Sequence, residues 1–244
     1  MNNSELLTIT NIPSLQYLGL TSQSDLIIER NDNLFDLNGL QSIKEIKGKL
    51  SVRFNDNLLN LDRLSGIQLV NNLIVIQRND NLLNTNGFRN IEFCNNTITI
   101  NDNLLLKSIN FQNLKRIKKK LIILANPELQ IIKGMNSIVK FEVGIRVTNN
   151  PNLNTIKAFN NLREAGKLLD LNNNGFLPNF NFLSKLKKEN GNFTLLLNHP
   201  TSLSGLDSLT RVENNFEIFP KTKTFNGLEN LSYVGNSLYI VSDS

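Results

Sequence analysis

Short segments in which two apolar residues enclose one variable residue recur along the chain about every 24 residues. This alternation is typical of a β-strand with one buried face, and the β-branched residues common in these segments favour strands. A fixed period of this length is typical of a solenoid, in which each repeat stacks on the next. We therefore predict parallel strands at Leu7–Ile9, Leu26–Ile28, Leu50–Val52, Ile74–Ile76, Ile98–Ile100, Leu121–Ile123, Ile145–Val147, Leu169–Leu171, Phe193–Leu195, Phe216–Ile218 and Leu238–Ile240.

A polar step, Asn-x-x-Leu, follows the strands and reads Asn-Asp-Asn-Leu in several copies. Asparagine tolerates left-handed backbone geometry and bonds its own backbone, so it suits a corner. Stacked coils place equivalent side chains roughly 4.8 Å apart, within reach of each other's amides. We predict a structural asparagine ladder, with a polar ligand groove as the alternative, at Asn31, Asn55, Asn79, Asn101, Asn126, Asn150, Asn174 and Asn198.

A second apolar pattern follows each polar step, with apolar residues at an uninterrupted spacing of three, as in Leu37, Leu40, Ile43 and Ile46. A long helix would alternate spacings of three and four. We therefore predict tight 3₁₀-like turns or very short strands on the remaining sides of each coil. The predicted fold is an all-β repeat solenoid, a right-handed parallel β-helix related to leucine-rich repeats, with about ten coils of 22–25 residues. We expect one domain over residues 1–244, with repeats from about residue 7 to 240.

The repeat resembles the receptor L-domain, a relative of the leucine-rich repeat. The resemblance rests on the phrase that runs from Leu26 to Leu40, in which an apolar strand is followed by Asn-x-x-Leu and then Leu-x-Gly-Leu. It covers nearly the whole chain, although the cysteine-rich modules that flank the receptor domains are absent. The resemblance implies a right-handed β-helix-like solenoid used for recognition, usually outside the cell, with the large sheet contributing to ligand binding.

Aspartates form a second predicted column at Asp32, Asp56, Asp80 and Asp102. Stacked carboxylates repel one another unless they are solvated or bridged by a cation. Oxygen-rich repeat turns can hold Ca²⁺, but the glycine-rich calcium repeat is missing. We therefore expect a solvated turn edge rather than a metal site, and we expect no cofactor.

Basic residues gather at the opposite corner, just before the strands. They form a solvated ridge or attract anionic glycans or an acidic partner. The net charge of +5 is too weak to indicate nucleic acid, and no nucleic-acid-binding motif is present. The members of this basic corner are Lys47, Lys49, Lys115, Arg116, Lys118, Lys119, Lys120, Lys140, Lys167, Lys187 and Lys188.

Catalytic side chains are scarce. His199 is the only histidine, and no partner completes a triad with the nearby serines. Outward-facing carboxylates at Glu29, Asp170 and Glu217 lie coils apart, whereas glycoside hydrolysis needs two that converge. Cys94 is expected to be a small, buried residue that packs in the core. We predict a non-enzymatic recognition module, with a carbohydrate-active β-helix enzyme or an intracellular protein-interaction scaffold as the alternatives.

Residues between and after the inward-pointing strand positions face outward. This predicted face carries many apolar side chains, and Ile122 and Leu124 form a centre with a polar rim, as in protein interfaces. We predict that it binds a protein or glycan, and that it or the uncapped solenoid ends mediate self-association. The predicted contacts are Arg53, Val75, Gln77, Ile122, Leu124, Arg146 and Thr148.

The sequence does not determine in which cellular compartment the protein resides. The start lacks a signal peptide, and no apolar run is long enough to span a membrane, so we expect no direct membrane insertion. We expect an extracellular or cell-surface location if the chain is a fragment of a longer protein, and a cytoplasmic one if it is complete. Asn95, Asn192 and Asn230, with Asn2 at the start, are candidate glycosylation sites. All but Asn2 are expected in turns just before a strand.

Overall fold

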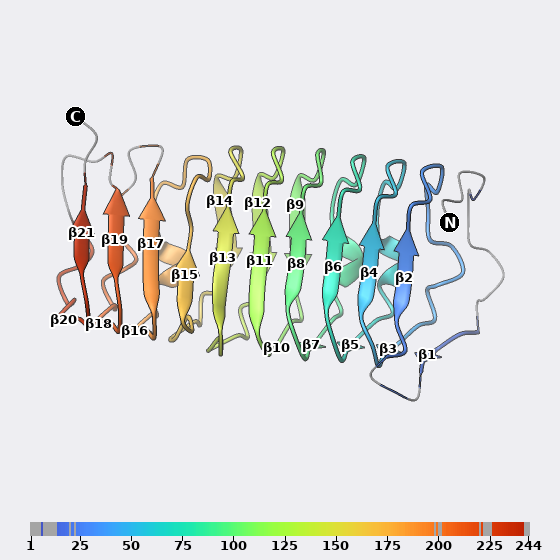
Figure 1. Cartoon of the computed structure of the whole chain (residues 1–244), viewed down its shortest axis with the longest axis horizontal. Helices are drawn as coiled ribbons and strands as arrows, with labels where there is room; N and C mark the ends of the chain where they lie inside the picture. Colours follow the sequence, from blue (N-terminus) through green and yellow to red (C-terminus); the bar gives the residue numbers. More distant parts are fainter. Residues whose placement is uncertain are drawn as a thin grey trace.

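The computed structural model describes residues 6, 14–19, 21, 23–197, 199, 202–219, 221 and 226–241. The chain winds into an all-β solenoid of about nine turns, with one strand per coil in a continuous ten-stranded parallel sheet (Figure 1). Leu26 pairs with Leu50 at one end of the sheet and Phe216 with Leu238 at the other, so the coils contain 22 to 24 residues. The predicted parallel β-solenoid is confirmed.

The ten strands of the large sheet coincide with the predicted apolar triplets, and the expected strand at residues 7–9 lies outside the described residues. Their bounds are β2 (Leu26–Glu29), β4 (Leu50–Arg53), β6 (Ile74–Gln77), β8 (Ile98–Asn101), β11 (Lys120–Leu124), β13 (Gly144–Thr148), β15 (Leu168–Asp170), β17 (Asn192–Leu196), β19 (Phe216–Phe219) and β21 (Leu238–Ile240).

A second side of the coils is built from two-residue strands. One sheet contains β1 (Tyr17–Leu18), β3 (Glu45–Ile46), β5 (Leu69–Val70), β7 (Phe93–Cys94) and β10 (Arg116–Ile117). Another contains β16 (Lys188–Glu189), β18 (Arg211–Val212) and β20 (Tyr233–Val234). Single bridges from Lys140 to Glu164 and from Glu164 to Lys188 lead into this second sheet.

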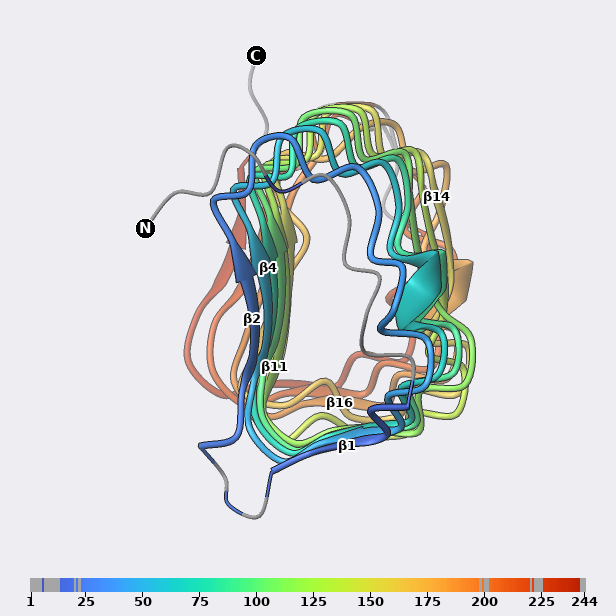
Figure 2. The ribbon, with the colours of Figure 1, turned by 90° about the vertical axis from the view of Figure 1, so that its right-hand side faces the viewer.

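The third side combines short 3₁₀ turns with a small sheet, and Figure 2 shows it opposite the large sheet. The tight turns and short strands predicted from the spacing of three are therefore confirmed. The turns are η1 (Asp62–Leu64), η2 (Asn86–Phe88) and η3 (Asn181–Leu183), and the strands are β9 (Ser108–Phe111), β12 (Ile131–Gly134) and β14 (Thr155–Ala158).

Inward-facing side chains from all sides fill one continuous apolar core. In β4 and β6, for example, Leu50, Val52, Ile74 and Ile76 are completely buried. The apolar residues of a coil pack against the other sides of the same coil and against the adjacent coils, as expected of a stacked repeat.

The asparagine ladder is confirmed, with one correction. The side-chain amide of each member donates to the side-chain oxygen of the next, at distances between 3.1 and 3.3 Å. The ladder runs through Asn31, Asn55, Asn79, Asn103, Asn126, Asn150 and Asn174. Asn198 lies outside the described residues.

Asn101 is not a ladder residue, so this part of the prediction was wrong. In the other coils the phrase Asn-Asp-Asn-Leu begins five residues after the first residue of the apolar triplet, which is the ladder position. In this coil the triplet begins at Ile98 and the phrase begins only three residues later, at Asn101. Asn103 therefore occupies the ladder, and Leu106 takes the buried position of Leu82. Asn101 is the last residue of β8 and lies on its outer side.

The residue before each ladder asparagine adopts the left-handed conformation, so the corner turns one residue earlier than the asparagine step suggested. The φ angles in this left-handed column range from 49° to 59°. Side chains with a Cβ are disfavoured in this geometry, most of all when bulky, whereas asparagine is tolerated. The column contains Arg30, Phe54, Arg78, Asp102, Ala125, Asn149 and Asn173.

The C-terminal end of the solenoid exposes core positions. Leu238 and Ile240 in β21 are 49% and 53% exposed, while their β19 neighbours Phe216 and Ile218 are fully buried. In the part of the chain that the structure describes, no helix is long and apolar enough to cross a bilayer.

Candidate binding surface

The predicted contact residues lie together on the outer face of the large sheet. Strand register places Val75, Thr99, Ile122 and Arg146 side by side in one row. Gln77, Asn101, Leu124 and Thr148 form the next row, with Arg53 beside Gln77. We call these the two outer rows. Parallel pairing across adjacent strands thus brings into one patch residues that are far apart in the sequence.

Two residues of this patch were not among the predicted contacts, although Thr99 was expected on the outer face. Thr99 lies between Val75 and Ile122, and Asn101 lies between Gln77 and Leu124. Asn101 was assigned to the ladder because its local phrase matched the other coils. The register of β8 against β6, rather than the phrase, is the signal that would have placed it correctly.

Thr148 is a second correction, because it is only 6% exposed and cannot serve as an open contact. It has the outward parity that the alternation predicted, since Ile145 and Val147 beside it are buried. It lies between the longer side chains of Leu124 and Asn172 on the adjacent coils. Parity fixes the direction of a side chain but not its exposure.

A hollow lies in the middle of the outer face, over the position of Gly144. Its volume is about 20 Å³, and its walls include Lys120, Ile122, Arg146 and Leu168. A space of this size accommodates about one water molecule or a small apolar group. A Cβ at Gly144 would lie 2.3 Å from the Leu168 carbonyl oxygen, so the close coil contact requires glycine. A small hollow therefore lies beside the apolar centre, and the side chains of Lys120 and Arg146 border it.

Ion pairs fix the charged side chains at both ends of the patch. Arg53 Nε donates to Glu29 Oε1 at 2.8 Å, and Ser51 Oγ donates to the same oxygen at 2.7 Å. The hydrogen bond from Arg53 lowers the pKa of Glu29 below its usual value. Arg146 Nε donates to Asp170 Oδ2 at 3.0 Å. Both arginines are thus held close to the sheet, on either side of the apolar centre.

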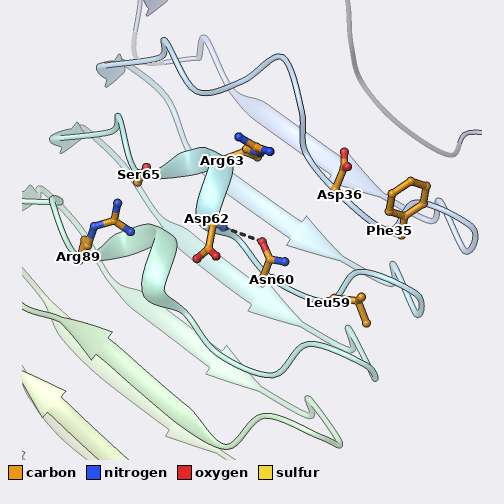
Figure 3. Close-up of a pocket in the computed structure, with 8 residues that line it drawn as sticks. All are labelled: Phe35, Asp36, Leu59, Asn60, Asp62, Arg63, Ser65 and Arg89. Atoms are coloured by element: carbon orange, nitrogen blue, oxygen red, sulfur yellow. Dashed lines mark hydrogen bonds between the residues drawn. The ribbon is translucent and has the colours of Figure 1, made fainter.

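A shallow groove of about 600 Å³ forms a second concave surface, on the corner and third side of the first coils (Figure 3). Phe35 and Leu59 stand at one end, and Arg89 and Ser65 at the other. The Asp36 carboxylate accepts from Asn38 at 2.9 and 3.0 Å, and Asn60 Oδ1 accepts from the Asp62 N–H at 3.1 Å. These local bonds occupy much of its polar lining.

The aspartate column is shorter than predicted. Asp32, Asp56 and Asp80 occupy successive coils, but Asp102 lies in the left-handed column and Leu104 takes its expected place. Burial, followed by the charges of Asp80 and Asp32, raises the pKa of Asp56. Among the described residues, no group of three or more histidine, cysteine or acidic side chains has the arrangement to hold a metal ion.

The basic corner is partly neutralised by its own neighbours. Lys47, Lys49, Lys115, Lys140 and Lys188 pair with carboxylates at 2.6 to 3.6 Å. Each carboxylate belongs to the same side of the coil or to an adjacent coil, as in the pair between Lys140 and Glu164. This compensation fits a solvated ridge better than a site that attracts anions.

Glu189 is a buried ionisable residue that the sequence analysis missed. It faces the core in β16, where its strand partner is Val212, and it is completely buried. Neither carboxylate oxygen has a hydrogen-bond partner among the described residues. Burial raises the pKa of Glu189 to about 9. The nearby Gly191 N–H lowers this pKa, but it is not positioned to form a full hydrogen bond with the carboxylate. Glu189 is therefore neutral at physiological pH.

Cys94 is buried, as predicted, and burial raises its pKa to about 11. His199 contacts the Phe176 ring, with the ring centres 6.2 Å apart.

The candidate glycosylation sites differ in their surroundings. Asn95 Nδ2 donates to Asn71 Oδ1 at 2.7 Å, and Asn230 lies in a turn. Asn192 is the first residue of β17 rather than part of the turn before it. Asn2 lies outside the described residues.

Comparison with protein-family models, with curated proteins and with solved structures finds no match. The resemblance to the receptor L-domain therefore stays a prediction.

Proposed function

We propose that the protein is a non-enzymatic recognition module that binds a protein or glycan through the two outer rows of its large sheet. One observation carries this proposal: Ile122 borders the hollow at Gly144 together with Lys120 and Arg146, and Leu124 and Gln77 lie in the neighbouring row. An apolar centre with a polar rim is the anatomy of a protein interface. A rigid sheet also presents these groups with little loss of entropy on binding.

The carboxylates favour binding over catalysis. Glu29 and Asp170, on β2 and β15, are each engaged by an arginine. Six strand intervals separate these strands, which is roughly 29 Å at the usual strand spacing. Glycosidases place their two carboxyl groups within about 5–10 Å of each other. Glu217 on β19 lies nearer, two intervals from Asp170 in the same row and thus roughly 10 Å away, at the upper limit of that range, but Arg146 already engages the Asp170 carboxylate. A carbohydrate-active enzyme therefore remains the weaker alternative.

We infer a role at a cell surface, in line with the resemblance to receptor L-domains, and the intracellular scaffold is the competing proposal. Mass spectrometry of native material distinguishes the two, because glycans at Asn95, Asn192 or Asn230 require passage through the secretory pathway. Cytosolic fractionation of the unmodified protein would support the scaffold instead.

The binding proposal is tested with the double variant Ile122→Ser and Leu124→Asp. Wild-type and variant are screened on a glycan array and against extracellular proteins displayed from the source organism, and hydrolase activity on bound glycans is assayed in parallel. Wild-type binding that the variant loses, with unchanged far-UV circular dichroism and no hydrolysis, is the expected result.

A matched control uses Phe35→Ser with Leu59→Asp, which removes two exposed apolar side chains from the groove of Figure 3. This variant should bind as the wild type does. Loss of binding in the control alone would assign recognition to the groove and overturn the proposal for the sheet.

We also propose self-association through the C-terminal end, supported by the exposed core positions Leu238 and Ile240. An open strand edge beside apolar side chains is a template for pairing. Sedimentation velocity should detect association that weakens in the variant Ile240→Asp, and concentration-independent monomers in the wild type would contradict it.

A further inference from the structure

Three arginines gather around one aromatic ring at the corner that follows β2, β4 and β6. The guanidinium carbons of Arg30 and Arg78 each lie 5.7 Å from the centre of the Phe54 ring, and that of Arg53 lies 5.9 Å away. These distances are within the range of cation–π attraction. Arg30, Phe54 and Arg78 follow one another on successive coils, so the ring is positioned between the two arginines along the solenoid axis.

The residues at this corner are unfavourable for its backbone. Arg30, Phe54 and Arg78 have φ angles of 58°, 56° and 49°. Two later coils place Asn149 and Asn173 at the same position, and asparagine tolerates this geometry better than arginine or phenylalanine does. Residues held in unfavourable backbone conformations are common at functional sites, and here they coincide with a cluster of positive charge.

Arg30 and Arg78 have no carboxylate partner. Within the described chain, neither side chain forms an ion pair or a hydrogen bond, and both are exposed. The nearest candidates are engaged elsewhere. Glu29 accepts from Arg53 and Ser51, and Asp102 Oδ2 accepts from Asn101 at 2.7 Å and from Gln77 at 3.4 Å.

The aspartate column does not neutralise the cluster either. Among the described residues, neither Arg30 nor Arg78 forms an ion pair with Asp32, Asp56 or Asp80, although Arg78 and Asp56 line the same hollow. Carboxylates border the cluster on one side, where Asp56, Asp80 and Asp102 line this hollow together with Phe54 and Arg78. An anion is therefore expected to approach from the other side, over the outer face of the sheet, where Gln77 can bond a hydroxyl group.

We propose that Arg30, Arg53 and Arg78 form a binding site for a sulfated polysaccharide chain that lies along the solenoid axis. Guanidinium groups bind sulfate and similar oxyanions with paired hydrogen bonds, and Phe54 holds them in place. Arg30 and Arg78 occupy equivalent positions two coils apart, roughly 10 Å along the axis, and Arg53 of the intervening coil lies one residue before that position, whereas same-side residues of an extended peptide repeat roughly every 7 Å. A sulfated sugar chain carries closely spaced anions and meets successive guanidiniums without a fixed register.

The test uses the double variant Arg30→Asn and Arg78→Asn. Asparagine suits the left-handed corner, so the urea midpoint should stay equal to that of the wild type or rise. Binding of fluorescent dextran sulfate, measured by anisotropy at physiological salt, should weaken at least tenfold. The control Lys118→Asn with Lys119→Asn removes the same charge from two exposed lysines at the opposite corner and should change the affinity less than threefold.

Equal losses in the two double variants would mean attraction by net charge alone and would overturn the site. Uncharged dextran of the same length should not bind, and poly-glutamate should bind at least tenfold more weakly than dextran sulfate. Preference for poly-glutamate would assign the corner to an acidic protein segment and contradict the polysaccharide. The site shares Arg53 and Gln77 with the two outer rows but not their apolar centre, so the Ile122→Ser and Leu124→Asp variant should retain dextran sulfate binding even where it loses the ligand of the outer rows.

Discussion

The side-chain amide of Asn79 donates a 3.3 Å hydrogen bond to the side-chain oxygen of Asn103, two residues beyond the asparagine that the repeated phrase selects. The amide of Asn103 in turn donates to the backbone carbonyls of Ile76 and Asn101, at 3.2 and 3.0 Å. From Asn55 onward, each ladder residue satisfies backbone carbonyls of its own coil and of the preceding one, which links neighbouring coils at the corner.

Replacing Asn103 by alanine should lower the free energy of unfolding by about 1–3 kcal/mol. The substitution removes the acceptor of the buried Asn79 backbone N–H and one donor each from the Ile76 and Asn101 carbonyls, and a buried group left unpaired carries a penalty of this size. Urea denaturation followed by circular dichroism measures the change. Asn101→Ala is the matched control, and it should cost about 1 kcal/mol or less, because the half-buried Asn101 side chain loses one hydrogen bond, to Asp102. A larger loss for Asn101→Ala than for Asn103→Ala would return Asn101 to the ladder.

Replacing Ala125 by asparagine should stabilise the protein by roughly 0.5–1 kcal/mol, because alanine is held in left-handed geometry that asparagine tolerates better. The reverse substitution, Asn149→Ala, should destabilise it by at least as much, since it also removes the 3.2 Å hydrogen bond from Asn173. Thermal or urea unfolding of both variants checks the pair. Destabilisation by Ala125→Asn would argue against the left-handed column.

Glu189 should make the stability of the protein depend on pH. Its pKa is about 9 in the folded protein, against 4.5 for an ordinary glutamate, so unfolding releases a proton between these values. The free energy of unfolding should therefore fall as pH rises through this window, by at most about 1.4 kcal/mol per pH unit from this group. Below pH 4.5 the contribution is constant, because both states are protonated.

The variant Glu189→Val matches Val212, its neighbour in the core, and isolates this contribution. The difference in stability between variant and wild type should grow from pH 4.5 towards pH 9 in favour of valine. Glu189→Gln, which keeps the shape but cannot ionise, should remove the same pH dependence. A constant difference across this range would mean that the carboxyl group is already ionised in the folded protein.

The fold could be predicted because its signals are local and repeated. Apolar triplets such as Ile74–Ile76 became strands of the large sheet, and the spacing of three became short turns and strands. A period alone does not fix the phase within one coil, so Asn101 was confused with Asn103, and Asp102 was placed in the wrong column.

The patch on the outer face was predicted in outline, since strand parity gives direction. Parity could not reveal that Thr148 is covered or that Gly144 leaves a hollow, because both depend on side chains from adjacent coils. Glu189 was not predicted to be buried, because a charged residue in a short segment is normally expected to lie on the surface. The arginine cluster around Phe54 requires stacking of residues about 24 positions apart, which only the coil register provides.

The most direct test of recognition by the two outer rows is a hydroxyl-radical footprint of the protein with its first identified glycan or protein ligand. Oxidation of Ile122 and Leu124, compared with the free protein, should fall at least severalfold, while oxidation of Phe35 and Leu59 in the groove should not change. Unchanged oxidation of Ile122 and Leu124 in the saturated complex would contradict the proposal that this face binds the ligand.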